Sequence, residues 1–161
     1  MTRREYNKAV DLYSDNLYRF ILKNVRDSEK AKDIVQDTFV KVWDKHEDVS
    51  FEKAKSYLFS AGYRTMIDVL RRDQKQTRFE DADENNFTTS RQYSDLQEIL
   101  HEALNKLPEQ QKAVILLRDY EGYDYKEIGE ITGLNESQVK VYIYRGRKFL
   151  QKYIGSMEAV I

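Results

Sequence analysis

The sequence contains no cysteine, one proline and six glycines among its 161 residues. Without cysteine the chain can form neither disulfides nor thiolate metal sites, and the absence fits a reducing compartment. The shortage of proline and glycine, together with a charged fraction of 34%, favours a nearly all-helical protein. Its length allows one ordinary domain or two small ones.

Long apolar runs are missing as well. No stretch approaches the roughly 18 residues of a membrane span, and the first residues lack the apolar centre of a signal peptide. We therefore expect a cytoplasmic protein that does not insert into a membrane. The two histidines have no second ligand at metal spacing, and no phosphate loop or nucleophile motif occurs. We expect no enzymatic activity, no catalytic residue, no metal and no cofactor.

Helical periodicity organises the first 72 residues. A helix is expected from about Arg4 to Val25, and a second from Asp27 or Ser28. A third, with Ser50 as its cap, is expected to end near Arg72. The apolar side of the second helix predicts core positions at Ala31, Ile34, Val35, Phe39, Val42 and Trp43.

Residues 73–93 have almost no apolar period, which predicts a flexible linker. Seven acidic residues stand against three basic ones between positions 73 and 98, so the linker is acidic. A capping box at Ser94–Gln97 then opens an amphipathic helix, and Pro108 suits the first turn of another. The Ala113–Leu117 run is apolar on every side and predicts a central helix. The expected all-α fold has two small helical domains, 1–72 and 94–161, joined by residues 73–93.

The stretch from Asp124 onward predicts a helix-turn-helix. Asp124 precedes Glu127 by three residues, as Asn135 precedes Gln138, and each pair has the pattern of a helix start. Gly133 suits a left-handed turn between the two helices. Gly129, inside the first helix, would let a second helix cross closely.

The second of these helices has two distinct faces. One is apolar, comprising Val139, Tyr142, Ile143, Gly146, Phe149, Leu150 and Tyr153. The other comprises Ser137, Lys140, Val141, Tyr144, Arg145 and Lys148, with Arg147 on its flank. Between positions 136 and 153 five basic residues stand against one acidic residue, which favours phosphate binding. A basic helix alone could equally be a solvated surface, but the capped turn before it favours DNA binding.

The third helix of the first domain is unusually aromatic. Phe51 and Tyr57 fit either stacking on single-stranded bases or burial in the core, whereas Phe59 fits the core better.

Several blocks of the sequence resemble, in order, a bacterial RNA polymerase sigma factor of the extracytoplasmic-function (ECF) subfamily. They are Leu17–Leu22, Asp33–Trp43, Lys55–Ala61, Ile67–Arg72, Leu107–Glu109 and the helix-turn-helix. The resemblance covers nearly the whole chain except the linker and the last few residues.

This resemblance implies binding to core RNA polymerase and to two promoter DNA elements, and an anti-sigma factor as a further partner. The core polymerase residues would be Asp33, Gln36 and Asp37. The melted minus-ten element would meet Phe51, Lys53, Ser56, Tyr57, Arg64, Arg71 and Arg72. The upstream duplex element would meet Ser137, Lys140, Val141, Tyr144 and Arg145, with Arg147 and Lys148 nearer its backbone.

Two other functions remain open at this point. A free-standing helix-turn-helix regulator would use its first half for dimerisation or sensing. The acidic face of the second helix, the long linker and the absence of a heptad seam disfavour this function, and we expect a monomer. A helical adaptor would leave the basic face unexplained.

The linker length predicts a change of shape. Two turns of duplex span about 70 Å, which roughly 20 residues reach only when fully extended. A relaxed coil of that length averages about 25 Å. We therefore expect the free protein to be more compact than the promoter-bound one, with the acidic linker able to approach the basic face.

Overall fold

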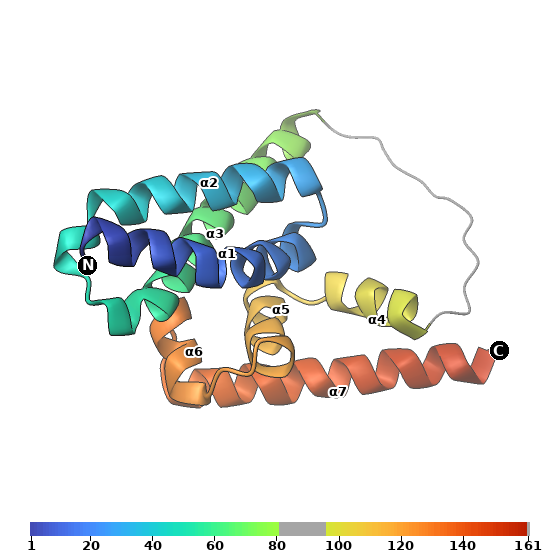
Figure 1. Cartoon of the computed structure of the whole chain (residues 1–161). Helices are drawn as coiled ribbons and strands as arrows, with labels where there is room; N and C mark the ends of the chain where they lie inside the picture. The colour runs from blue at the N-terminus through green and yellow to red at the C-terminus, as the bar shows by residue number, and fades with distance from the viewer. Residues whose placement is uncertain (81–95, 161) are drawn as a thin grey trace.

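The computed structural model describes residues 1–80 and 96–160, and every regular element in these ranges is a helix (Figure 1). The elements are α1 (Arg3–Val25), α2 (Ser28–Asp44), η1 (His46–Asp48), η2 (Phe51–Lys53), α3 (Ala54–Glu80), α4 (Leu96–Asn105), α5 (Glu109–Ile115), η3 (Leu116–Tyr120), α6 (Tyr125–Thr132) and α7 (Glu136–Val160). Of the short elements, η1 and η2 are 3-10 helices and η3 is a π-helix. The all-α fold class is confirmed. None of the described helices is long and apolar enough to cross a membrane.

Local signals place both ends of α1 and the start of α2. Thr2 and Glu5 form a capping box at the start of α1, and Arg26 closes its end in the left-handed conformation with φ 58°. Asp27 then caps α2 by accepting a hydrogen bond from the Lys30 amide at 3.1 Å. These side chains satisfy amides that a helix start leaves unpaired.

Helix α3 continues to Glu80, so its expected end near Arg72 is wrong. Asp73 pairs with Lys30 of α2, and Gln74 donates to the Glu109 carboxylate at 2.8 Å, so this extension has partners. Its start also differs, because Ser50 makes no capping bond and η2 comes between. Residues 81–93 of the expected linker and the cap at Ser94 lie outside the described residues. The division into two functional domains remains a prediction.

The central helix of the C-terminal half is the apolar run Ala113–Leu117. All five of its residues are at most 1% exposed. Residues 113–115 close α5 and residues 116–117 open η3. Because α5 contacts α7 and α1, and η3 contacts α1 and α6, the run is covered on several sides, as its composition predicts. Gly122, with φ 76°, ends this segment before the chain turns into α6.

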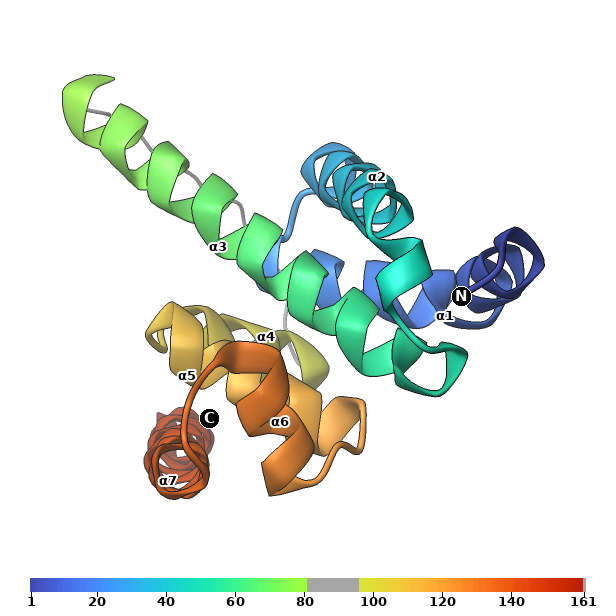
Figure 2. The ribbon, with the colours of Figure 1, turned by 90° about the vertical axis from the view of Figure 1, so that its left-hand side faces the viewer.

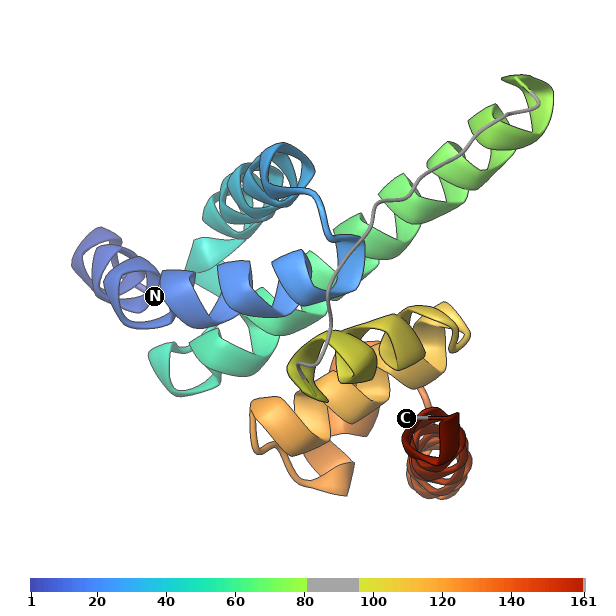
Figure 3. The ribbon, with the colours of Figure 1, turned by 90° about the vertical axis from the view of Figure 1, so that its right-hand side faces the viewer.

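The two halves pack against each other. Figure 2 shows α3 lying between the pair α1 and α2 and the C-terminal helices, and α6 packs directly on α3. One cluster of buried side chains runs through both halves, from Leu17 and Phe20 through Phe59 to Leu117 and Ile128. Figure 3, which is seen from the side opposite to Figure 2, shows α4 on the near side of the C-terminal half. Helix α4 is also in contact with α7. The described part of the chain is therefore compact, with α7 on its outer side (Figure 1).

One expected core position is wrong. Trp43 is 40% exposed, and it lies outside both clusters of buried residues. Its ring stacks on His46 with centroids 3.9 Å apart and meets Tyr6 edge-on at 4.9 Å. The helical period placed Trp43 at the edge of the apolar face, where a large ring can pack on neighbouring surface residues.

Candidate nucleic-acid interface

Both helices of the helix-turn-helix begin with a reciprocal pair of hydrogen bonds. The Asp124 carboxylate accepts from the Glu127 amide at 2.8 Å, and the Glu127 carboxylate accepts from the Asp124 amide at 3.0 Å. Asn135 and Gln138 repeat this arrangement at the start of α7, at 2.8 and 3.0 Å. The predicted helix starts and the left-handed Gly133, with φ 81°, are confirmed. The starts of α6 and α7, and the turn at Gly133, are thus set by neighbouring residues.

Two glycines allow close approaches within this unit. A Cβ on Gly129 would lie 2.7 Å from the Leu134 carbonyl oxygen, so this glycine admits the turn rather than the expected crossing helix. A Cβ on Gly146 would lie 2.3 Å from Cδ1 of Ile115, so Gly146 leaves room for the Ile115 side chain between α7 and α5. The sequence assigned Gly146 to the packing face but gave no sign of the contact with Ile115.

Helix α7 presents the two faces that its sequence predicts. The apolar set is buried or half-buried against α4, α5 and α6. The opposite set is exposed, comprising Ser137, Lys140, Val141, Tyr144, Arg145 and Lys148. Val141 is 42% and Tyr144 62% exposed, which is high for large apolar or aromatic side chains. Exposed cations around solvent-facing apolar groups suit a surface that binds phosphates and base edges.

Arg147 is the exception among these residues. Its guanidinium pairs with the carboxylate of Asp119 in η3, and this hydrogen bond raises the pKa of Arg147. Both side chains remain partly exposed. Any phosphate contact by Arg147 therefore competes with Asp119. The ammonium groups of Lys140 and Lys148 instead lie over the rings of Tyr125 and Tyr144, each 5.7 Å from the ring centroid.

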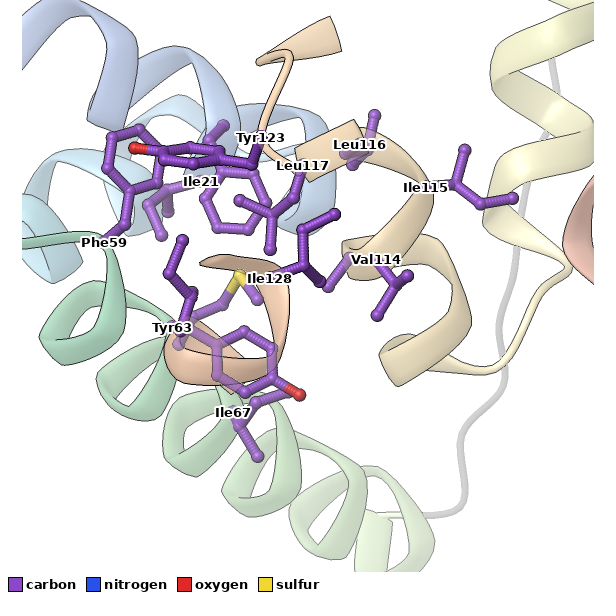
Figure 4. Packing of buried hydrophobic residues seen from close by; sticks show 14 of the residues in the cluster. Ile21, Phe59, Tyr63, Ile67, Val114, Ile115, Leu116, Leu117, Tyr123 and Ile128 are labelled. Atoms are coloured by element: carbon purple, nitrogen blue, oxygen red, sulfur yellow. The ribbon is translucent and has the colours of Figure 1, made fainter. Parts of the chain in front are cut away.

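A second basic face lies along η2 and α3. Lys53, Arg64, Arg71 and Arg72 are exposed, while Phe51, Ser56 and Tyr57 are half-buried. Phe51 and Tyr57 pack against the smaller apolar cluster yet keep part of each ring accessible, so burial and stacking are both open to them. Phe59 is fully buried (Figure 4), with its ring 5.6 Å from that of Phe20, which confirms its assignment to the core.

Helix α2 carries an exposed face on the side away from its core contacts. Asp33, Gln36 and Asp37 all lie there. Val40 follows them on the same side of the helix; it is 61% exposed and was not singled out in the sequence. The spacing from Asp33 through Asp37 to Val40 was the available signal, because positions four and seven residues apart share one side of a helix. An apolar side chain surrounded by polar ones is typical of a protein contact. In the described part of the chain the acidic residues form no group that could hold a metal.

Comparison with known proteins connects these faces to two family models. Residues 9–76 match the model described as Sigma-70 region 2, and residues 97–150 match Sigma-70, region 4. The RNA polymerase sigma factor SigV of Bacillus subtilis (strain 168) is 35% identical over 160 residues, covering 94% of this chain and 95% of that protein. The ECF RNA polymerase sigma factor SigM of the same strain is 24% identical, with 90% and 92% covered. The chain belongs to the ECF subfamily of RNA polymerase sigma factors.

Solved structures share the fold of this sigma factor. The sigma factor RpoE of Bartonella quintana, in complex with the anti-sigma factor NepR, superposes with a TM-score of 0.79 at 24% identity, covering 94% of this chain and 98% of RpoE. CnrH, in complex with the cytosolic domain of CnrY, gives a TM-score of 0.70 at 20% identity and covers 96% and 90%. The likeness extends over both helical halves. The faces of α2 and α3 fall in the region 2 match, and the helix-turn-helix falls in region 4.

Proposed function

We propose that this sigma factor binds core RNA polymerase and directs promoter-specific initiation through three separate surfaces. The observation that carries the proposal is that α2, α3 and α7 each present an exposed polar face inside a matched sigma region. The protein then acts by binding, in the cytoplasm where the polymerase is, and the chemistry belongs to the polymerase. The anti-sigma proteins bound to RpoE and CnrH support a similar partner here.

The α7 face reads the upstream promoter element as duplex. A single exposed helix face fits a major groove. Its residues fall into two groups, those that contact base edges and those that contact the DNA backbone. Lys140, Val141, Tyr144 and Arg145 contact base edges, with Ser137 at the helix start. Arg147 and Lys148 contact the backbone. Arg145 is the residue suited to bidentate recognition of guanine, because a guanidinium matches its two acceptor atoms.

The α3 face holds the melted downstream element. Phe51 and Tyr57 offer ring surface for stacking on unpaired bases, and Ser56 lies beside them in sequence. Lys53 and Arg64 lie along the strand, and Arg71 and Arg72 contact phosphates further along α3. All four cations are exposed, which supports this assignment.

The α2 face binds the polymerase. Asp33, Gln36 and Asp37 supply charge and hydrogen bonds, and Val40 supplies apolar area beside them. Charged groups at such an interface select the partner and its orientation.

Charge reversal tests this surface. Asp37→Arg should weaken co-elution with core polymerase at least about tenfold without lowering the melting temperature, because Asp37 is exposed. Asp11→Arg, at an exposed carboxylate of α1, is the matched control and should co-elute like the unchanged protein. Initiation is then measured with core polymerase on a library of genomic fragments. Equal co-elution of both variants would show that the α2 face is not the polymerase contact.

A further inference from the structure

A cavity lies between the end of α1 and helix α4, apart from the three faces described above. It has a volume of about 350 Å³ and is lined by Leu22, Lys23, Arg26, His101, Leu104 and Asn105. The first two of these residues belong to the last turn of α1, Arg26 is its C-cap, and the other three belong to α4. Cavities of roughly 300–1,000 Å³ hold small ligands. The cavity is therefore large enough for a small molecule.

Positive charge gathers around this cavity. None of its six lining residues is acidic, and Arg26 is exposed and pairs with no carboxylate in the described part of the chain. Burial lowers the pKa of His101, and the positive charge of Arg26 adds to this effect. Lys23 and Lys112 act in the same direction, whereas Glu98 raises the pKa. An anion in the cavity would relieve the repulsion among the basic groups.

The lining side chains also offer hydrogen-bond donors. The Lys23 ammonium lies over the Tyr120 ring, 4.2 Å from its centroid, a contact that orients the cation without neutralising it. The Asn105 side-chain oxygen accepts from the Lys112 ammonium at 2.6 Å, which leaves the amide NH2 group to donate. Arg26 adds a planar guanidinium that matches two oxygens at once. A phosphoryl group has three oxygens that accept such hydrogen bonds, so it fits this donor set.

Two leucines give the cavity an apolar wall. Leu104 is 3% exposed, and Leu22 is half-buried. Ligand cavities commonly combine apolar walls with a few polar groups that fix the orientation of the ligand. The wall is suited to the ring or chain of a ligand whose phosphate meets the cations, and inorganic phosphate alone would leave it uncovered.

We propose that this cavity binds a phosphate monoester that carries an apolar ring or chain. Arg26 and Lys23 hold the phosphate, and His101 lies beside it. The two leucines pack against the apolar part. The site is separate from the three faces of the proposed function, so its test needs neither polymerase nor promoter.

Titration of phenyl phosphate into the isotope-labelled full chain tests the site. This probe combines a dianionic phosphate with an aromatic ring. Two-dimensional NMR should show saturable shifts of the backbone amides of residues 22–26 and 101–105, with a dissociation constant in the millimolar range expected of so small a ligand. Phenyl phosphate that produces no saturable shift of these amides overturns the site.

Two simpler probes separate the parts of the ligand. Inorganic phosphate lacks the ring and should bind about fivefold more weakly than phenyl phosphate. Phenol lacks the phosphate and should produce no saturable shift. If inorganic phosphate binds as tightly as phenyl phosphate, or if phenol binds as tightly, the proposed ligand class is wrong.

Arg26→Asn removes one charge from the cavity and keeps the backbone conformation. Asparagine tolerates the left-handed region that Arg26 occupies, with φ 58°. The variant should bind phenyl phosphate about tenfold more weakly, the loss expected for a charge-assisted hydrogen bond. Lys32→Gln is the matched control, because it removes one exposed positive charge of α2 that does not line the cavity. Its binding should stay within about twofold of the unchanged protein. Equal weakening by both variants would mean that net charge alone attracts the phosphate, and would overturn the site.

The two histidines of the chain give a second readout in the same sample. Their carbon-bound ring protons report protonation by NMR. A bound dianion favours the imidazolium form, so the pKa of His101 should rise when phenyl phosphate is saturating. His46, in η1, does not line the cavity and is the internal control. A His101 pKa that stays constant, or that moves only as much as that of His46, contradicts the site.

Discussion

The helix-turn-helix and the contact between the two halves differ in how their polar groups are paired. In the helix-turn-helix the capping side chains of Asp124 and Asn135 are paired reciprocally with Glu127 and Gln138. Where the two halves meet, the Tyr123 ring packs edge-on against Phe59 of α3, but the buried Tyr123 hydroxyl is unpaired within the described residues. Reciprocal caps satisfy the amides that a helix start leaves unpaired, whereas a buried polar group without a partner weakens the contact that buries it. The helix-turn-helix is therefore fixed by its own residues, and the contact between the halves keeps an uncompensated cost.

Breaking the helix-turn-helix should have the largest effect. Gly129→Ala places a methyl group 2.7 Å from the Leu134 carbonyl oxygen, and only a backbone shift can relieve that contact. We expect a loss of roughly 1–3 kcal/mol in the free energy of unfolding, despite the better helix propensity of alanine. Because the shift reorients α7, affinity for the upstream duplex should fall more than tenfold.

The matched control for this change is Gly155→Ala. Gly155 also lies in a helix, but a Cβ there would meet nothing within 4 Å. Alanine at this position should leave duplex binding unchanged and raise the melting temperature slightly. Equal stability and duplex affinity of the two variants would mean that the close approach at Gly129 does not fix the turn.

The second prediction concerns the surface of the helix-turn-helix. Arg145→Ala should cost roughly 1–3 kcal/mol at one base pair, so discrimination at that position is lost. Lys148→Ala should weaken binding to all sequences similarly and reduce its salt dependence. Selection of duplexes from a random library with each variant measures the difference. If the two variants select the same sequences with the same losses, the division into base and backbone contacts is wrong.

The sequence predicts the helix-turn-helix because its determinants are local. The Asp124 and Asn135 caps find their partners three residues away, and Gly133 reports its own backbone conformation. The exposed cations of α7 recur at helical spacing, and a short stretch of sequence is enough to recognise that spacing. In the same way the boundaries of α1 and α2 follow from neighbouring caps.

The contact between the halves has no comparable signal. Arg19 and Glu121 are 102 positions apart, and Lys112 and Asn24 are 88 apart, so neither pattern is visible along the chain. The linker length predicts a compact free protein, and the described halves do pack together, but the residues that join them could not be named. The extension of α3 was missed for the same reason, because Asp73 is held by Lys30 of another helix. The proposed approach of the linker to the basic face involves residues outside those described.

The third prediction uses the pH dependence of folding stability at a buried lysine. Burial, with a smaller contribution from Arg26, lowers the pKa of Lys112 to about 8 from its ordinary 10.5. Below pH 8 the penalty for burying the ammonium is fully present, and it disappears as the pH rises toward 10.5. The contribution of Lys112 to folding stability therefore rises by about 1–2 kcal/mol between pH 7.5 and 9.5.

Lys112→Met should remove this rise in the free energy of unfolding, measured by denaturant at both pH values. Lys126→Met, at an exposed lysine of α6, should retain it. A rise that persists in Lys112→Met would have to come from another group, and burial of the ammonium would then not be its cause.

The smallest and most specific change is the removal of one oxygen atom from the contact between the halves. Tyr123→Phe keeps the ring that meets Phe59 and deletes the hydroxyl that is buried without a partner in the described structure. Because the penalty for that hydroxyl disappears, the variant should gain on the order of 1 kcal/mol in stability. Thermal melting of the variant and the unchanged protein measures the gain.

Tyr6→Phe is the matched control of opposite sign, because the Tyr6 hydroxyl donates to the Phe39 carbonyl at 2.7 Å. Its loss should cost about 1 kcal/mol. If Tyr123→Phe melts at a lower temperature, as Tyr6→Phe should, the Tyr123 hydroxyl has a partner, and the difference in polar pairing between the helix-turn-helix and the contact between the halves disappears.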